Sequence, residues 1–520
     1  SNDTLMTMIE VVAFIVAATV FYFLLRLALL YFRWRFSPLW ALPGPKRETW
    51  LLGQFRTIQK EPFMSPHKRW WKEAGVETPL IHYCQPAGTH SIMVLDPDIV
   101  KQILVANYGS NPQFAKNLYM LKRLLGKGLI TLEGPDWQRH RRICNPSFQP
   151  KIIQKALEDA APIVVKEVIS YWKQAGSRGI DISKHLSNLT LDILGKVAFA
   201  HEFHALESIK NWAEQDNSSN GDHLIPVSDK LYSCMNYMFK NLPRIIFLRM
   251  FHLTALDFKT KNNMMKMNEA TNTVVDIARK KKETNSRKRP FSLLQRLFDA
   301  KDSKSVRNVS RHLSNEELQD EVKTFIIAGH ETTSAWCYWA VFTLCKYPDI
   351  QEKVYKDIID HAKDGEINLE TIKEMSYFNA FAKEVLRLYP SVGMILRHTV
   401  KEISLKGTIL PAQTRMLIPI HLLHRHPLYW EDPNSFKPER WLQDKIPYGH
   451  SHVYLPFSSG PRNCIGQNFA EMEAKLILVP LIREFKFQLH SSQINTDFTF
   501  TTFITMKAKP DVKVCIGCRA

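Results

Sequence analysis

The apolar and polar positions divide the chain into an apolar N-terminal run and a long body with mainly helical periodicity. Val11 to Phe32 is mostly apolar, and Arg26 is its only charged residue. As a helix this run reaches about 33 Å, enough for a hydrocarbon core of about 30 Å. Helical spacing dominates from Asp98 to about Tyr389, whereas strand-like alternation is sparse and early, at Pro79–Tyr83 and Ser91–Leu95. We therefore expect a mainly α fold with small β-sheets and one N-terminal transmembrane helix.

Charges flank the apolar run unequally. Acidic Asp3 and Glu10 precede it, and basic residues follow it at Arg33, Arg35, Lys46 and Arg47. Because cytoplasmic flanks are rich in Lys and Arg, this asymmetry predicts a single-pass anchor with the bulk of the chain in the cytosol. A cleaved secretory signal is the alternative, but the run is too long and has neither a basic start nor a small-residue cleavage site.

The sequence predicts three parts. Residues 1–36 form the membrane anchor, and residues 37–48 form a proline-rich connector, in which three prolines favour a short stiff link rather than a helix. Residues 49–520 form one body, since no linker-like stretch divides them.

Composition and charge limit the function classes. With 45% hydrophobic residues the chain can bury a large core. Its 69 Lys+Arg against 51 Asp+Glu give a net charge of +18, which favours anionic partners such as a membrane surface or an acidic protein. The 8 cysteines are too few and too irregular for a disulfide framework, which indicates a reducing compartment. No dinucleotide fingerprint, P-loop or flavin module is present, so electrons for a redox reaction would need a partner protein.

One long helix is predicted over residues 315–346. Ser314 and Glu317 form a capping box at its start. Gly329 and Glu331 interrupt the apolar middle of the helix. Because a glycine and a buried acid both destabilise a plain core helix, we expect a bound group beside them; a buried polar kink without function is the alternative.

A ten-residue motif near the C-terminus carries the strongest chemical signal. It reads Phe457-Ser458-Ser459-Gly460-Pro461-Arg462-Asn463-Cys464-Ile465-Gly466 and resembles the haem-binding loop of the cytochromes P450. The resemblance implies that Cys464 is the thiolate ligand of haem iron, the ligand type that favours O–O cleavage. It also implies that Phe457, Gly460 and Gly466 shape the loop beneath the porphyrin and that Arg462 faces a propionate. A structural cysteine in a turn is the alternative.

Further motifs follow the order typical of this family. Glu384 and Arg387 share a helical face, and Arg440 in the Pro438–Trp441 segment would complete a structural Glu-Arg-Arg network. Trp137 and Arg141, four residues apart, match the propionate-binding pair of the family, and a surface cation–aromatic pair is the alternative.

Arg397 is a third candidate for a propionate. Glu331 and Thr332 match the acid–alcohol pair that supplies protons for dioxygen cleavage, so monooxygenation is favoured over isomerisation or dehydration. Ala328 and Gly329 would let oxygen and substrate approach the haem. Many fatty-acid ω-hydroxylases have a glutamate, bonded covalently to haem, where this chain has Ala328. We therefore expect a non-covalent haem and leave terminal-carbon selectivity open.

The resemblance implies a haem-thiolate catalytic domain over residues 49–520 with haem b as cofactor and O2 as co-substrate. Electrons would come from NADPH through a separate NADPH-cytochrome P450 reductase. The expected location is the endoplasmic reticulum membrane, and no nucleic-acid partner is expected. The Gly329–Glu331 and Asn463–Ala470 segments are similar to fatty-acid hydroxylases and plant lipid or terpenoid hydroxylases, so the expected substrate is a hydrophobic lipid, fatty acid, sterol or terpenoid.

Two other readings remain open. One is a haem- or lipid-binding module without turnover, and the other is a thiol-metal protein built on Cys515 and Cys518. Leu242–Phe251 is apolar with two arginines and could dip into a bilayer or pack in the core. The stretches expected to face substrate are Asn111–Leu125, Leu242–Thr254, Ile326–Thr333, Ser391–Leu396 and Thr501–Phe503.

Overall fold

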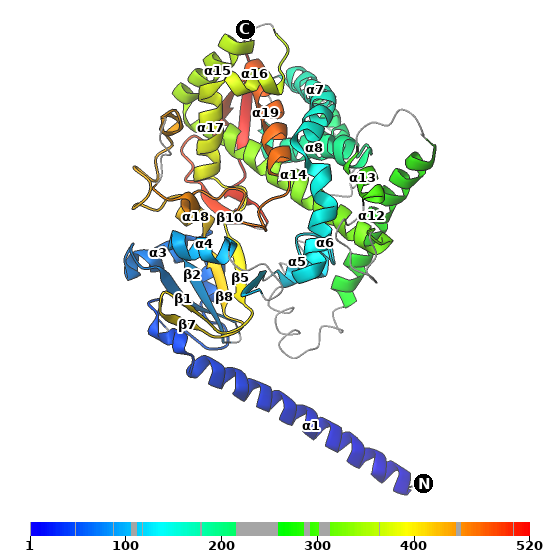
Figure 1. Ribbon diagram of the computed structural model, residues 1–520, viewed down its shortest axis with the longest axis vertical. Coiled ribbons are helices and arrows are strands. Elements are labelled where there is room, and N and C mark those ends of the chain that lie inside the picture. The colour runs from blue at the N-terminus through cyan, green and yellow to red at the C-terminus, as the bar shows by residue number, and fades with distance from the viewer. Residues whose placement is uncertain are drawn as a thin grey trace.

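Helices form most of the chain in the computed structural model, and the largest sheet lies at the end of the body nearest α1 (Figure 1). The structure describes residues 2–46, 48–86, 88–105, 112–116, 118–176, 179–214, 258–284, 292–300, 312–362, 365–443, 449–502 and 504–519. The helices are α1 (Asn2–Arg35), α2 (Phe55–Lys60), α3 (Ser65–Ala74), α4 (Pro97–Val105), α5 (Tyr119–Leu125), α6 (Gly134–Cys144), α7 (Pro150–Ala175), α8 (Ile182–Leu194), α9 (Glu207–Glu214), α12 (Phe258–Thr284), α13 (Leu293–Asp299), α14 (Asn315–Lys346), α15 (Pro348–Ala362), α16 (Leu369–Glu374), α17 (Ser376–Leu388), α18 (Ile420–Leu423) and α19 (Gln467–Glu484). The predicted mainly α fold is confirmed.

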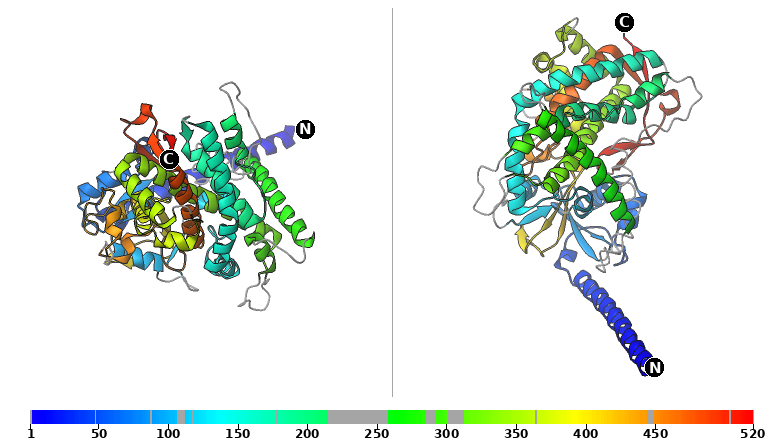
Figure 2. Two further views of the ribbon diagram at one scale, coloured as in Figure 1. Left: turned by 90° about the horizontal axis from the view of Figure 1, so that it is seen from above. Right: turned by 90° about the vertical axis from the view of Figure 1, so that its right-hand side faces the viewer.

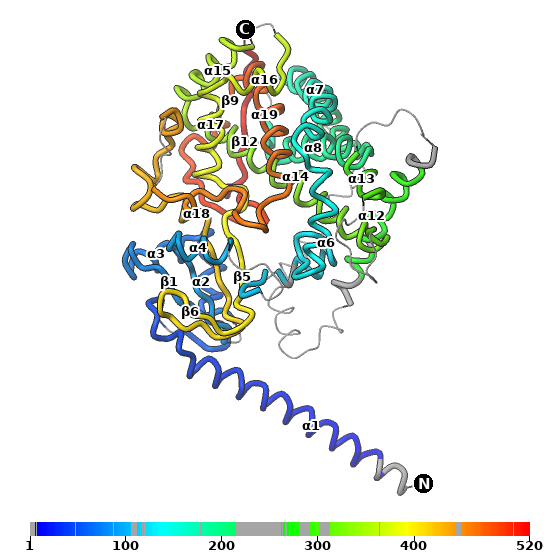
Figure 3. The backbone as a smooth tube through the Cα atoms, viewed as in Figure 1, coloured from blue at the N-terminus to red at the C-terminus, as the bar shows by residue number. Residues whose placement is uncertain are grey.

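The long helix α14 forms the centre of the body. Ser314 and Glu317 make the predicted capping box at its start, and Tyr347 follows its last turn. Figure 3 shows α8 and α19, far apart in sequence, packed along it. A Cβ atom at Gly329 would lie 2.8 Å from the Leu194 side chain of α8. The glycine therefore has a packing reason that sequence analysis did not see: it lets α8 approach α14 closely.

The strands are β1 (Leu80–Gln85), β2 (Thr89–Val94), β3 (Phe114–Lys116), β4 (Ile180–Asp181), β5 (Ile395–Thr399), β6 (Ile403–Leu405), β7 (Thr408–Leu410), β8 (Arg415–Ile418), β9 (Phe485–Leu489), β10 (Thr499–Thr502), β11 (Met506–Lys509) and β12 (Lys513–Cys518). The largest sheet has the order β1-β2-β8-β5-β3. The two early predicted strands are confirmed as β1 and β2. The expectation that strands are mainly early is wrong, because β5 to β12 all follow. Most are too short for alternation to show in sequence.

Helix α1 carries the apolar N-terminal run away from the body (Figure 2). Its large side chains are exposed, as at Phe14 with 75% and Phe21 with 67% exposure, so the body does not cover them. The helix is long and apolar enough to cross a membrane. One N-terminal apolar helix that could anchor the chain in a membrane is therefore present.

The connector differs from its prediction in one respect. Pro38–Ala41 forms a short 3-10 helix rather than an extended link, with the Ser37 hydroxyl accepting a hydrogen bond from the Leu39 amide. Proline at the first position of a helix is compatible with this turn, since its fixed φ suits the turn and the N–H it lacks would have no partner there. Leu39 is buried and the Trp40 ring packs on His82, so the connector lies against the sheet.

Candidate functional site

A cavity of about 1440 Å³ lies between α14 and the loop of residues 457–466. Its lining is mostly apolar and includes Leu121, Phe325 and Ile395. It brings together nine of the predicted site residues: Trp137, Arg141, Ala328, Thr332, Arg397, Phe457, Arg462, Cys464 and Gly466. Glu331, Gly460 and the Glu384 network do not line it.

The Cys464 thiol opens onto this cavity. Its side chain is accessible there, while protein atoms surround it on the other sides and their burial raises the pKa of the thiol. The amide of Gly466 and the charge of Arg141 oppose that rise in pKa, because both favour the thiolate. The Cys464 amide donates to the Phe457 carbonyl at 3.0 Å and closes the loop. The Phe457 ring meets Trp336 of α14 edge to face, which fixes the loop against the long helix.

The two loop glycines have different roles. Gly460 adopts φ +73°, and a Cβ atom there would lie 2.1 Å from the Leu104 carbonyl oxygen of α4. The bare side of Gly460 thus faces α4, and Gly460 is not among the residues that line the cavity; its place beneath a porphyrin stays a prediction. Gly466 does line the cavity, and a Cβ atom there would lie 3.9 Å from the Cys464 sulfur.

The predicted propionate ligands form a cationic end of the cavity. Arg141 donates to the Asn463 carbonyl at 2.9 Å and to its side-chain oxygen at 3.0 Å. Arg462 donates to Glu133 at 2.6 Å, and its guanidinium lies 4.0 Å from the centre of the Trp137 ring. Helix α6 therefore holds Trp137 and Arg141 on the face that meets the cysteine loop, and their role as propionate ligands stays a prediction.

Lys116 joins this cationic end and was missed by sequence analysis. It lies on β3 directly opposite Arg397 of β5, and its ammonium donates to the Ile130 carbonyl at 2.9 Å. Burial, followed by the charges of Arg462 and Arg397, lowers the pKa of Lys116 well below its usual value. A single lysine in a three-residue strand gives no sequence signal; only the strand pairing reveals it.

These groups fit the expected haem. The three arginines outnumber the one carboxylate near them, that of Glu133, which pairs with Arg462, so this end of the cavity carries excess positive charge. Such a set suits the two carboxylates of a haem, because guanidinium groups bind carboxylates in two-pronged geometry. The Cys464 thiol and the apolar walls suit the iron and the porphyrin.

The predicted acid and alcohol point in different directions. Thr332 lines the cavity, and its hydroxyl donates to the Ala328 carbonyl at 2.6 Å, which leaves the oxygen free to accept. Glu331 is buried and points toward β11, where it accepts from the Thr505 hydroxyl at 2.7 Å. The Lys507 ammonium lies 3.6 Å from the same carboxylate oxygen and is one-third exposed. Glu331 therefore contacts a partly exposed group, Lys507, and does not line the cavity.

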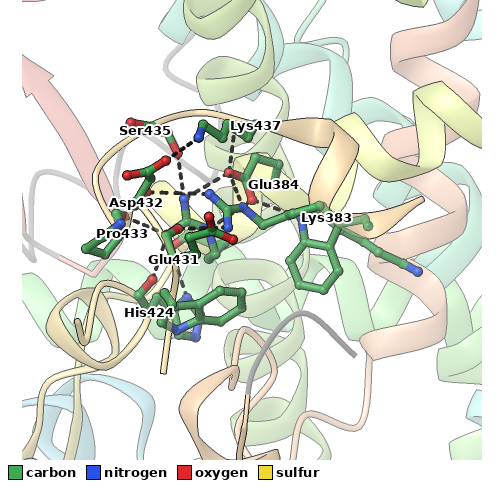
Figure 4. A network of polar contacts seen from close by, with 12 residues as sticks. Lys383, Glu384, His424, Glu431, Asp432, Pro433, Ser435 and Lys437 are labelled. Atoms are coloured by element: carbon green, nitrogen blue, oxygen red, sulfur yellow. Dashed lines mark hydrogen bonds and ion pairs between the residues drawn. The ribbon is translucent and has the colours of Figure 1, made fainter. Parts of the chain in front are cut away.

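The predicted Glu-Arg-Arg network is fully assembled in the core (Figure 4). Glu384 accepts from Arg387 at 2.8 and 2.9 Å and from Arg440 at 3.1 Å, and all three side chains are buried. The Trp441 indole and the Lys437 amide each donate to the same carboxylate at 2.9 Å. Five donor atoms from four residues thus converge on one carboxylate. The sequence motif predicted only the two arginines among these four residues.

His424 connects this network to the cysteine loop and was not predicted. Burial lowers its pKa to about 3, so the ring is neutral. Its Nδ1 lies 3.1 Å from the Arg387 carbonyl at the end of α17, and its Nε2 accepts from the Leu455 amide at 2.7 Å. A neutral ring that donates on one side and accepts on the other suits both contacts.

The second cysteine pair and most of the stretches expected to face substrate also lie among the described residues. Cys515 and Cys518 lie three positions apart on β12, so they face opposite sides of the strand. Of the substrate-facing stretches, parts of Asn111–Leu125, Ile326–Thr333, Ser391–Leu396 and Thr501–Phe503 line the cavity. Leu242–Thr254, which includes the Leu242–Phe251 segment, lies outside the described residues. Parts of α2, α3 and α8 also line the cavity, for example Ile58, Pro66 and Leu194, and these contributions were not predicted.

Comparison with known proteins agrees with this geometry. The sequence model of the family "Cytochrome P450" matches residues 43–515. The chain is 30% identical to cytochrome P450 4Z1 of Homo sapiens over 87% of both chains. It is 28% identical to cytochrome P450 4c21 of Blattella germanica, over 78% of this chain and 80% of the relative. It is also 28% identical to cytochrome P450 CYP72A219 of Panax ginseng, over 79% and 77%.

Proposed function

Because the chain belongs to the cytochrome P450 family, whose members are monooxygenases, we propose that it hydroxylates a hydrophobic lipid, either a fatty acid or a sterol or terpenoid. The observation that carries this proposal is the cavity, in which mostly apolar walls enclose the Cys464 thiol and the Thr332 hydroxyl. An apolar lining favours an apolar substrate, because such a molecule gives up few hydrogen bonds with water when it enters the cavity. Haem b would be held non-covalently, in agreement with alanine at position 328.

Each group of residues has its own task in the proposed reaction. When bound, haem supplies the activation of dioxygen, for which a thiolate ligand donates electron density. Cys464 would hold the iron, and the cationic end formed by Arg141, Arg397 and Arg462 would hold the propionates. The apolar walls exclude water from the substrate.

Protons would enter by a path that begins at the surface. Lys507 is partly exposed and touches Glu331, whose Oε2 atom is buried without a hydrogen-bond partner among the described residues. We place the proton store at this carboxylate and the delivery at the Thr332 oxygen, which can accept a hydrogen bond from a water molecule in the cavity. The side chains face different regions, so the relay needs water or a rotation of Glu331.

Electrons are proposed to come from NADPH through a membrane-bound cytochrome P450 reductase. The net charge of +18 supports attraction to an acidic partner. Helix α1 would hold the protein in the endoplasmic reticulum membrane with residues 49–520 as its cytosolic catalytic domain.

The test uses the full chain, loaded with haem, in lipid nanodiscs with a cytochrome P450 reductase. Candidate fatty acids, sterols and terpenoids are first ranked by substrate-binding spectral titration. Turnover is then measured with labelled dioxygen and NADPH. Incorporation of one labelled oxygen atom per product, with NADPH consumption, is expected. A product formed without oxygen uptake would instead indicate isomerisation or dehydration, and spectral binding without any turnover would indicate a non-catalytic haem or lipid-binding module.

A further inference from the structure

Three metal-ligating side chains gather where α1 meets the largest sheet, outside the cavity described above. His82 and Cys84 alternate along β1, so they share one face of the strand. His90 of β2 is the register partner of Cys84 and therefore points to the same side. In the part of the chain that the structure describes, this is the group of His, Cys, Asp or Glu whose ligand atoms all lie within 4.8 Å of one another. Figure 1 shows β1 and β2 in the sheet from which α1 projects.

The distances suit a small ion with nitrogen and sulfur ligands. The Cys84 sulfur lies 3.9 Å from His82 Nε2 and 4.0 Å from His90 Nδ1. In a tetrahedral zinc site, bond lengths of about 2.3 Å to sulfur and about 2.05 Å to nitrogen place these atoms about 3.6 Å apart. The two histidine nitrogens lie 2.7 Å apart and share a hydrogen bond. They would have to separate by about 0.7 Å to reach the nitrogen–nitrogen distance of such a site.

The connector packs against the cluster. The Trp40 indole lies edge to face on the His90 ring, with ring centres 5.5 Å apart. The Nδ1 atom of His90 faces His82 and Cys84, whereas its Nε2 atom is buried without a hydrogen-bond partner among the described residues. The Trp40 ring covers the cluster, with its centre 4.7 Å from that of His82.

We propose that His82, Cys84 and His90 bind one Zn²⁺ ion at the base of the membrane-anchoring helix. A thiolate and two neutral imidazoles form a ligand set that zinc prefers over calcium or magnesium, which take oxygen ligands. Binding releases the thiol proton of Cys84 and replaces the hydrogen bond between the two histidines. The ring that donates this hydrogen bond shifts its proton to its other ring nitrogen, so both rings stay neutral and each offers a lone pair to the ion. A water molecule completes the tetrahedron.

The ion has a structural consequence. All three ligands belong to the β1–β2 hairpin. The connector rests on the same face through Trp40, whose indole donates to the Trp34 carbonyl in the last turn of α1 at 2.5 Å. Zinc would therefore fix the surface on which the anchor sits and hold the orientation of α1 relative to the body.

The test uses the full-length, haem-loaded protein in detergent, so that the loop cysteine is occupied by haem. The protein is incubated with Zn²⁺ and freed of excess metal. Zinc and iron per chain are then measured by mass spectrometry, and the zinc ligands by X-ray absorption. We expect about one zinc per chain with one sulfur at about 2.3 Å and two or three nitrogen or oxygen atoms at about 2.0 Å.

Variants separate this site from other thiols. Cys84→Ser and His90→Gln are expected to lower bound zinc at least about tenfold, because each removes a direct ligand. The double variant Cys515→Ser with Cys518→Ser is the matched control and is expected to retain full zinc. Wild-type protein that holds no stoichiometric zinc, that holds copper in its place, or whose absorption spectrum lacks a sulfur ligand would overturn the proposal, whether or not the variants fold. Equal zinc content in wild type and Cys84→Ser would do the same.

Discussion

Replacing Glu384 by alanine removes the carboxylate on which five hydrogen-bond donors converge. Arg387 is 0% exposed and Arg440 is 8% exposed, so both guanidinium groups would lose a buried counter-charge. Breaking a buried ion pair by removing one partner costs about 3–5 kcal/mol. Arg387 keeps three carbonyl acceptors, those of His424, Pro433 and Ser435, which places the expected loss near the lower end, at about 3 kcal/mol.

The loss can be measured as retention of the haem-thiolate signal. The thiolate-type Soret band of reduced, carbon-monoxide-treated protein is followed against urea concentration for wild type and Glu384→Ala, together with haem per chain after purification. Because His424 joins the network to the Leu455 amide just before the cysteine loop, the variant is expected to bind less haem and to lose the band at lower urea.

Glu352→Ala is the matched control. Glu352 is also paired with an arginine, Arg519, at 2.9 Å, but its side chain is 46% exposed. Exposed ion pairs contribute at most about 1 kcal/mol, so this variant should behave almost as wild type. If Glu384→Ala shifted the urea midpoint no more than Glu352→Ala, the assignment of Glu384 as the buried centre of the network would be refuted.

The other predictions concern single positions. Gly460→Ala should destabilise the haem-loaded protein by at least about 2 kcal/mol in urea unfolding, because the new Cβ would clash with backbone at a residue that already has a positive φ. The control Gly407→Ala also has a positive φ, +81°, but no atom lies within 4 Å of its new Cβ, so it should lose only about 1 kcal/mol of stability. Equal losses in the two variants would contradict the contact of Gly460 with α4. Burial raises the pKa of Glu473 to about 8, so the folded state keeps a proton that the unfolded state releases, and stability should fall as pH rises from about 5 to 8. Glu473→Gln cannot ionise and should make this decline shallower by up to about 1.4 kcal/mol per pH unit; an unchanged slope would disprove the buried neutral acid. Thr332→Val keeps the shape but loses the hydroxyl, and product formed per NADPH consumed with reductase should fall at least about tenfold if this oxygen delivers protons.

Local chemistry explains why parts of this protein could be read from sequence. The capping box at Ser314 needs only residues three apart, and the long helix follows from an uninterrupted period. The cysteine loop is equally local, because the amide that closes it and the thiol it presents both belong to Cys464, seven positions from Phe457. The apolar run of α1 depends on composition alone.

Contacts between distant segments were decided only by the tertiary structure. Lys116 becomes part of the cationic end because β3 pairs with β5, and the need for glycine at position 460 arises from the carbonyl of Leu104. Glu331 and Thr332 are neighbours in sequence, yet a helix turns successive side chains by about 100°, so one faces β11 and the other the cavity. The sequence by itself determines which chemical groups are available and how a short segment folds. Which groups from distant segments meet is determined by the packing of those segments, because strand register and burial depend on the whole chain.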